Sequence, residues 1–239
     1  MARFLLIHGS CHGAWCWRDV IPALEAAGHQ ARAIDLPGRG DHSGAPGAVT
    51  LADHAQAIAA ALDKPAIVVG HSMAGYPITA TAELVPHKVQ ALVYLCAYRP
   101  VSGMSLVEMR RAGPRQPLAG VLRVSDGCFS FDPAQVPDLF YHDCPQDAVD
   151  LATARLVPEP VLPQETPLVL TAASRGVAQH YIRCANDRVI PPEYQAVMAQ
   201  GLPEGHHSVL EAGHSPFFSM PETLAQRLSQ IAGASVSGH

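Results

Sequence analysis

Short apolar runs and amphipathic stretches alternate along most of the chain. The apolar runs have the continuous character of strands that are buried on both faces of a sheet. They predict strands at residues 4–7, 30–35, 66–69, 89–96, 179–184 and 207–210. The amphipathic stretches predict helices at residues 17–27, 50–63, 73–85, 191–201 and 221–231. Strands that alternate with helices predict a mostly parallel sheet with helices on both faces.

Two local signals mark the ends of predicted helices. Gly28 follows the first helix at the position where a glycine commonly ends a helix. Thr50 and Asp53 have the spacing of a capping box at the start of the second helix.

Residues 98–166 interrupt this alternation. The segment is rich in proline, contains Phe129, Phe131, Phe140 and Tyr141, and has no strong signal for a buried strand. An insertion of this size near the carboxyl ends of the strands is typical of a lid over a site. We therefore predict a core made of residues 1–97 and 167–239, with residues 98–166 as its lid.

The composition limits the classes of partner. The 239 residues are 48% hydrophobic and 15% charged, against a usual charged share of about 25%, so the chain can bury a large core. The formal net charge is −5, and no basic run is longer than the pair Arg110–Arg111. A surface for nucleic acid or for an anionic membrane is therefore not expected.

Targeting signals and cysteines indicate the compartment. No apolar stretch approaches the roughly 18 to 20 residues of a membrane span, and the apolar run at residues 4–7 is too short for the core of a signal peptide. The six cysteines are then expected to be free thiols in a reducing compartment. We predict a cytoplasmic protein; its oligomeric state stays open, with a homodimer as one alternative.

The strongest strand signal leads directly into a serine motif. Residues 66–69 are followed by Gly70-His71-Ser72-Met73-Ala74-Gly75 at the start of a predicted helix. This context is typical of a nucleophile elbow, in which the serine hydroxyl projects from a tight turn between strand and helix. The alternative is that Ser72 only caps the helix, a role that serine favours.

A serine nucleophile needs a histidine base, and that histidine needs a carboxylate to fix its tautomer. When the serine lies in such a turn, the acid and then the histidine follow it in the chain. Asp187 follows the predicted strand at 179–184, and His214 follows the last predicted strand. We therefore predict Ser72, Asp187 and His214 as the catalytic residues.

The chain contains other candidates for the catalytic histidine and for the catalytic acid. His206 and His207 lie at the start of the last strand, at the opposite end of the sheet from His214. The other acids, Asp126, Asp138 and Asp143, fall in the predicted lid. The alternative for Asp187 is that it is only a turn residue paired with Arg188. The alternative for His214 is that it is only a solvated loop residue.

The loop after the first strand is expected to supply one of the two backbone N–H donors that stabilise the negative charge formed when the serine attacks. Gly9 permits the backbone to turn there, so the amides of Ser10 and Met73 are predicted to form an oxyanion hole. A metal site is not expected, because Cys11, His12 and Cys16 have no second pair at the spacing that zinc needs. A dinucleotide site is not expected either, because Gly38-x-Gly40 lacks the third glycine. No cofactor is implied.

These motifs resemble a known family. Residues 8–17, 24–29, 70–75, 187–195 and 212–214 are similar to the α/β-hydrolases that group plant methylesterases and hydroxynitrile lyases with bacterial esterases similar to pyrethroid hydrolases. The resemblance covers nearly the whole chain outside the lid. It implies an α/β-hydrolase fold and the same triad and oxyanion residues. One departure is Ala74, where the family usually has glycine.

The resemblance also separates two chemistries. The lyases carry Thr, Glu and Lys where this chain has Gly9, His71 and Ser215. This difference favours ester hydrolysis through an acyl-enzyme over cyanohydrin cleavage. The alternatives are lyase or acyltransferase activity on the same triad, or a receptor for a small ligand that does not depend on turnover.

The predicted substrate is a small-molecule ester in an apolar pocket. The residues expected to contact it are His12, Phe129, Phe131, Phe140 and Ser215. For the lid aromatics, the alternative is simple packing within the lid.

Overall fold

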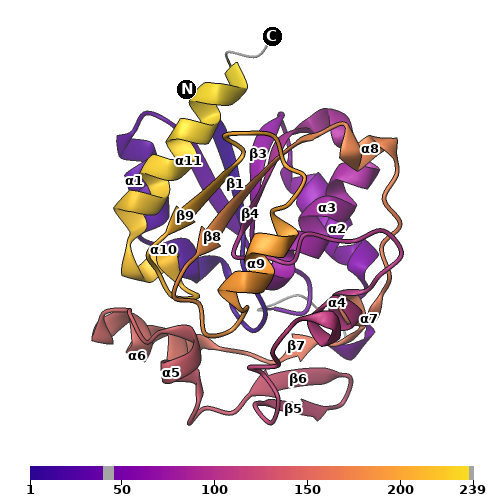
Figure 1. Cartoon of the computed structure of the whole chain (residues 1–239), viewed down its shortest axis with the longest axis vertical. Coiled ribbons are helices and arrows are strands. Elements are labelled where there is room, and N and C mark those ends of the chain that lie inside the picture. The colour runs from indigo at the N-terminus through magenta and orange to yellow at the C-terminus, as the bar shows by residue number, and fades with distance from the viewer. Residues whose placement is uncertain (40–45, 237–239) are drawn as a thin grey trace.

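A computed structural model of the chain describes residues 1–39 and 46–236, and a six-stranded sheet forms its centre (Figure 1). The strand order is β2-β1-β3-β4-β8-β9, and every neighbouring pair is parallel. The strands are β1 (Arg3–Ile7), β2 (Gln30–Ile34), β3 (Ala66–His71), β4 (Val89–Leu95), β8 (Ala178–Cys184) and β9 (His207–Leu210). All six strands occur where the apolar runs predict them, with small changes at their ends.

Burial follows position in the sheet. Every residue of β3 is buried, and β4 exposes only Gln90. The edge strand β2 has no fully buried residue. The central strands therefore have the longest apolar runs, since both of their faces are covered.

Helices cover both faces of the sheet. On one face α1 (Val20–Ala26) packs against α11 (Pro221–Val236), and on the other α2 (Leu51–Ala61) packs against α3 (Gly75–Leu84) (Figure 1). The other helices outside residues 98–166 are α8 (Ala172–Arg175), α9 (Pro192–Met198), α10 (Pro216–Ser219) and the 3₁₀ turns η1 (Ala14–Trp17), η2 (Pro46–Ala48), η3 (Ser72–Ala74) and η4 (Pro86–Lys88).

The predicted helix ends are confirmed at two places. The Asp53 amide donates to Thr50 Oγ1 over 3.1 Å, and the Thr50 amide donates to Asp53 Oδ2 over 2.8 Å, which makes the capping box. Gly28 has a φ of 82° at the end of α1, in the left-handed region that glycine favours. The helix predicted from residue 17 begins at Val20, because Trp17 belongs to the preceding 3₁₀ turn.

The elements between residues 98 and 166 form a layer at the carboxyl ends of the strands, at the bottom of Figure 1, and α7 (Leu162–Glu165) of this layer contacts α2. The other elements of the layer are α4 (Leu106–Ala112), β5 (Leu122–Ser125), β6 (Cys128–Phe131), α5 (Val136–Phe140), α6 (Gln146–Arg155) and β7 (Glu159–Pro160). The strands pair antiparallel in the order β5-β6-β7. The sequence contains no strong strand signal here because β5 is largely exposed and β7 has only two residues.

A buried ion pair fastens this layer to the core. Arg39, in the loop after β2, pairs with Glu159 of β7, and both side chains are almost completely buried. The Arg39 guanidinium also donates to the carbonyl of Pro158 over 2.7 Å, and Glu159 accepts from the amide of Cys11 over 2.7 Å. The neighbouring Gly40 lies outside the described residues, so the Gly38-x-Gly40 motif is described only in part.

The structure shows the state of the cysteines and the character of the helices. All six cysteines are free, and five of them are buried. Within residues 1–39 and 46–236, no helix combines the length and the apolar character that a membrane crossing requires.

Candidate active site

The turn after β3 places Ser72 at the carboxyl edge of the sheet. Ser72 has a φ of 57°, an uncommon conformation for a residue with a side chain. The turn is tight, since a Cβ added at Gly70 would lie 2.9 Å from the carbonyl oxygen of Ala74. The helical run η3 and α3 follows at once, so Ser72 stands between strand and helix.

Ser72 begins a chain of hydrogen bonds with His214 and Asp187. The distance from Ser72 Oγ to His214 Nε2 is 3.1 Å, and that from His214 Nδ1 to Asp187 Oδ2 is 2.8 Å. A carboxylate only accepts, so Nδ1 carries the proton and Nε2 presents its lone pair to the serine hydroxyl. His214 and Asp187 are buried, and Ser72 is 9% exposed.

Asp187 is held firmly in this position. Its Oδ1 accepts from the amides of Val189 and Ile190 over 2.7 and 2.9 Å. Its Oδ2 accepts from Gln195 Nε2 over 2.8 Å, in addition to His214. Gln195 is fixed in turn, because its Oε1 accepts from the amide of Cys184 over 2.9 Å. Gln195 was not predicted as a site residue, although it lies in the resembling segment 187–195.

The alternative partners lie elsewhere. Arg188 pairs with Asp138 and not with Asp187. Asp143 accepts from the amide of Gly213 over 2.6 Å, so it supports the loop that carries His214. His206 stacks on His180 at 4.1 Å and bonds the carbonyl of Gln179, near the amino ends of β8 and β9.

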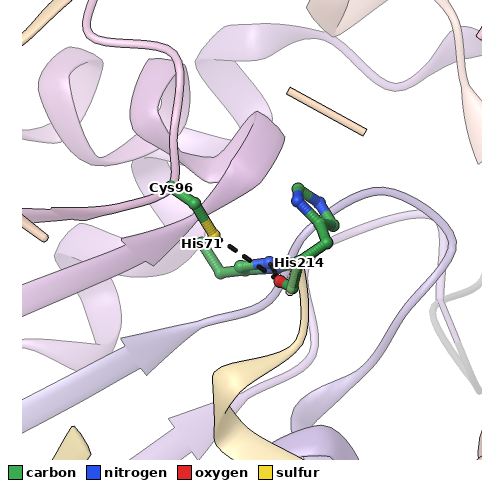
Figure 2. Close-up of side chains that lie close together, drawn as sticks. All are labelled: His71, Cys96 and His214. Carbon is green, nitrogen blue, oxygen red and sulfur yellow. Dashed lines mark hydrogen bonds between the residues drawn. The ribbon is translucent and has the colours of Figure 1, made fainter. Parts of the chain in front are cut away.

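The backbone of His214 is held from the side of β3 and β4. Figure 2 shows His71 Nε2 and Cys96 Sγ converging on the carbonyl oxygen of His214, at 2.8 and 3.5 Å. Burial holds the pKa of His71 well below its ordinary value, so its ring is neutral and donates through the one N–H it has. These contacts fix the loop from which the His214 ring reaches Ser72.

The same three residues are the only group in the described chain with the proximity of a metal site. Their possible ligand atoms lie within 4.8 Å of one another. Burial raises the pKa of the Cys96 thiol well above its ordinary value, so it stays protonated and is a poor ligand. The His71 N–H is committed to a carbonyl, so the donor set does not suit a divalent cation.

Ser10 and Met73 lie beside Ser72 and line the same cavity. Met73 occupies the first turn of a helical run, where backbone amides have no acceptor within the helix. Among the described loop and turn residues, no group accepts from the Ser10 amide. The Ser10 hydroxyl accepts from Gln164 Nε2 over 2.9 Å, which connects this loop to α7.

The cavity in front of Ser72 is narrow, with a volume of about 20 Å³. Its other lining residues come mostly from residues 98–166 and the loop after β8: Tyr98, Leu106, Arg110, Leu118, Phe129, Phe131, Phe140, Gln164, Val189 and Ile190. The predicted contacts Phe129, Phe131 and Phe140 are therefore beside Ser72. Tyr98, Arg110 and Gln164 were not predicted, because nothing local marks them.

His12 and Ser215 do not line this cavity. Both ring nitrogens of His12 are used, since Nδ1 bonds the Ser10 carbonyl at 2.8 Å and Nε2 the Tyr141 hydroxyl at 2.6 Å. Burial lowers the pKa of His12 to about 4, so the ring is neutral. Ser215 is fully buried at the start of α10, and its hydroxyl has no hydrogen-bond partner among the described residues. In this structure His12 supports the Ser10 loop.

Comparison with known proteins identifies the family. The chain belongs to the alpha/beta hydrolase family, whose model matches residues 4–227. Methylesterase 18 of Arabidopsis thaliana is 30% identical over 97% of this chain and 97% of its own length. The carbendazim hydrolyzing esterase of Nocardioides sp. (strain SG-4G) is 31% identical over 97% of this chain and 100% of its own.

A solved structure agrees with the sequence matches. The crystal structure of a pyrethroid hydrolase from Sphingobium faniae JZ-2 has a TM-score of 0.89 and 25% identity, and the match covers 99% of each chain. Within the alpha/beta hydrolases, the chain is a carboxylesterase-type hydrolase of the branch that holds plant methylesterases and bacterial esterases. The predicted fold, family branch and class of enzyme are thus confirmed.

Proposed function

We propose that this chain hydrolyses a small carboxylic ester, with Ser72 as nucleophile, His214 as general base and acid, and Asp187 as the group that orients His214. The observation that carries the proposal is the unbroken hydrogen-bonded chain from Ser72 Oγ through the imidazole to the Asp187 carboxylate, at 3.1 and 2.8 Å. The esterase names of the full-length relatives support the same chemistry.

The reaction begins with attack of Ser72 Oγ on the ester carbonyl. His214 Nε2 takes the hydroxyl proton, and the resulting imidazolium is stabilised by Asp187. Collapse of the tetrahedral intermediate breaks the bond to the alcohol, which leaves with the proton from His214. Water then attacks the acyl-enzyme while His214 accepts its proton. Collapse of this second intermediate breaks the bond between Ser72 Oγ and the acyl carbon, and His214 returns the proton to Oγ as the carboxylic acid leaves.

The negative charge of the intermediate needs fixed donors. We assign this role to the backbone amides of Ser10 and Met73. Their position around the Ser72 cavity supports the assignment, as does the lack of a competing acceptor for the Ser10 amide among the described loop and turn residues. A removed donor of this kind costs about 10²- to 10³-fold in kcat. No step in this scheme requires a metal or an organic cofactor, so a chelator should leave the rate unchanged.

Residues 98–166 are proposed to act as the lid, over a core of residues 1–97 and 167–239. Phe129, Phe131 and Phe140 reach the Ser72 cavity from this segment, which supports a role in covering the substrate. The buried Arg39–Glu159 pair supports a lid that stays attached to the core at β7.

Labelling and kinetics test the proposed residues together. A fluorophosphonate should attach to Ser72, and peptide mapping should find the adduct there. Ser72→Ala or His214→Ala should lower kcat for p-nitrophenyl acetate by roughly 10⁵- to 10⁶-fold, by analogy with another serine hydrolase. Ser229→Ala, on α11, serves as the control and should retain full activity. An adduct on Ser10 or Ser215 would contradict the proposal.

We further propose a cytoplasmic location, supported by the six free cysteines. Cell fractionation would test it, and recovery of the protein outside the cytoplasm would contradict it. A homodimer stays a prediction, for which sedimentation equilibrium is the direct test.

A further inference from the structure

One charged side chain that lines the Ser72 cavity has no oppositely charged partner among the described residues. Arg110, in the last turn of α4, is half-buried and lines the same cavity as Ser72 and Met73. Within the described part of the chain, its guanidinium has no ion-pair partner and donates no hydrogen bond. The arginines at positions 18, 39, 115 and 188, by contrast, each pair with a carboxylate.

The nearest acid on the helix is committed elsewhere. The Glu108 carboxylate accepts from the amide of Ser105 over 2.7 Å and forms the capping box of α4. No Asp or Glu is among the residues that line the cavity. The cavity therefore carries the positive charge of Arg110 without a balancing negative charge from the described residues.

A second donor lies in the same cavity. Tyr98 is 6% exposed, and its hydroxyl makes no hydrogen bond with any described residue. Tyr98 and Arg110 influence each other electrostatically, which indicates that the phenol and the guanidinium are near neighbours. The walls beside them, including Leu106, Leu118 and Phe131, are apolar.

Partly buried donors without acceptors are unfavourable unless a ligand supplies the acceptor. An arginine fork suits a carboxylate, which can accept two parallel hydrogen bonds from it. We propose that the substrate is an ester that also carries a free carboxylate, separated from the scissile carbonyl by an apolar spacer, and that Arg110 binds this carboxylate with help from Tyr98.

This inference rests on the proposed function, since it places the scissile carbonyl at Ser72. Arg110 is a specificity-determining residue in this view and takes no part in bond making. The carboxylate can belong to either side of the ester. Monomethyl esters of dicarboxylic acids, from succinate to suberate, carry it on the acyl side, and acetoxyalkanoates carry it on the alcohol side.

The kinetic test compares each half-ester with its neutral dimethyl ester, and each acetoxyalkanoate with its neutral methyl ester. The wild-type protein should prefer a half-ester of one spacer length, chiefly through a lower KM. Arg110→Met should reduce the ratio of kcat/KM for half-ester over diester by roughly 10- to 100-fold, as for loss of a charge-assisted hydrogen bond. Arg110→Lys should restore part of the ratio. Arg111→Met is the matched control, because Arg111 is exposed on the same helix, and the ratio should not change.

A binding test removes the dependence on turnover. Ser72→Ala protein should bind the preferred half-ester in calorimetry, and addition of Arg110→Met should abolish this binding, with folding checked by thermal denaturation. Equal kcat/KM for the carboxylate-bearing esters of both series and their neutral methyl esters, together with hydrolysis that depends on Ser72, would overturn the carboxylate site and leave the esterase proposal intact. Absence of any Ser72-dependent hydrolysis would overturn the esterase proposal, and calorimetry would still decide whether Arg110 binds a carboxylate.

Discussion

Substitution of Gly9 by alanine should damage the proposed active site through His71. A Cβ added at Gly9 would lie 2.7 Å from His71 Nδ1 and 3.0 Å from Ser72 Cβ. The His71 ring is fully buried, with Phe217 edge-on at 5.0 Å and the His214 ring at 4.6 Å. The ring therefore has no space into which it can retreat without disturbing one of these neighbours.

The expected size follows from the cost of overpacking. An extra carbon in a well-packed core costs about 1 to 3 kcal/mol, and a chain of this length loses about 2 to 4 °C of Tm for each kcal/mol. His71 also holds the His214 carbonyl at 2.8 Å, so a shifted ring moves the proposed base relative to Ser72. Since a misplacement of about 1 Å can cost about 10²-fold in rate, we expect kcat for p-nitrophenyl acetate to fall by roughly 10- to 100-fold.

A double-mutant cycle separates this mechanism from general destabilisation. His71→Ala removes the ring atoms that a new Cβ would meet, so the losses of stability from Gly9→Ala and His71→Ala should not be additive. Gly233→Ala is the control, because a Cβ at Gly233 meets nothing within 4 Å, and it should leave kcat unchanged. Strict additivity, or a Gly9→Ala protein with wild-type kcat and Tm, would refute the reasoning.

Four further predictions concern other parts of the molecule. Asp187→Asn should lower kcat by roughly 10⁴-fold, because the tautomer of the proposed base is no longer fixed; near-normal activity would mean that another acid serves. Glu159→Ala should reduce the free energy of unfolding by about 3 to 5 kcal/mol in urea titrations, because its arginine partner stays buried and unpaired, whereas Glu193→Ala, at an exposed pair, should leave the urea midpoint nearly unchanged. Burial lowers the pKa of His54 from 6.5 to about 4 in the folded protein. As the pH falls from 6.5 towards 4, the unfolded state therefore binds a proton at this histidine that the native state does not bind. Stability should therefore drop by about 2 kcal/mol from pH 7 to pH 5 on account of this one group, and a His54→Gln protein should show a flatter dependence. The unmodified protein should release no cyanide from mandelonitrile above background, and brisk release that Ser72→Ala abolishes would favour the lyase alternative.

The architecture of the core could be predicted because its determinants are local. The central strands are buried on both faces, and such strands have continuous apolar runs that stand out in the sequence. The short strands β5 and β7 have no such run, because β5 is largely exposed and β7 is two residues long. Their pairing with β6 depends on contacts across the segment, which local patterns do not report.

The residues of the candidate site also divide into those that a local sequence signal marks and those that only tertiary contacts bring together. Ser72 is marked by its motif, and Asp187 and His214 are marked by their places after strands, so all three could be selected without the structure. Gln195 and Arg110 have no comparable mark. Gln195 contacts Asp187 because the turn of α9 brings it there, and Arg110 of α4 lines the same cavity as Ser72. Roles that arise from tertiary contacts of an ordinary helical residue cannot be found by spacing alone.

The positions that distinguish this chain from the lyases act as one unit in the structure. Gly9 and His71 are coupled by sterics, since a Cβ at position 9 would lie only 2.7 Å from Nδ1 of the His71 ring. His71 is coupled to His214 by its hydrogen bond to the carbonyl, and Ser215 is the next residue, buried beneath the same loop. A threonine at position 9 would therefore force the His71 ring to shift, and a lysine at position 215 would bury a charge where the structure has a hydroxyl without a partner among the described residues. A change at one of these positions alone should thus cost esterase activity without creating a lyase, because a side chain at position 9 would press on the His71 ring and a lysine at position 215 would bury a charge without a partner.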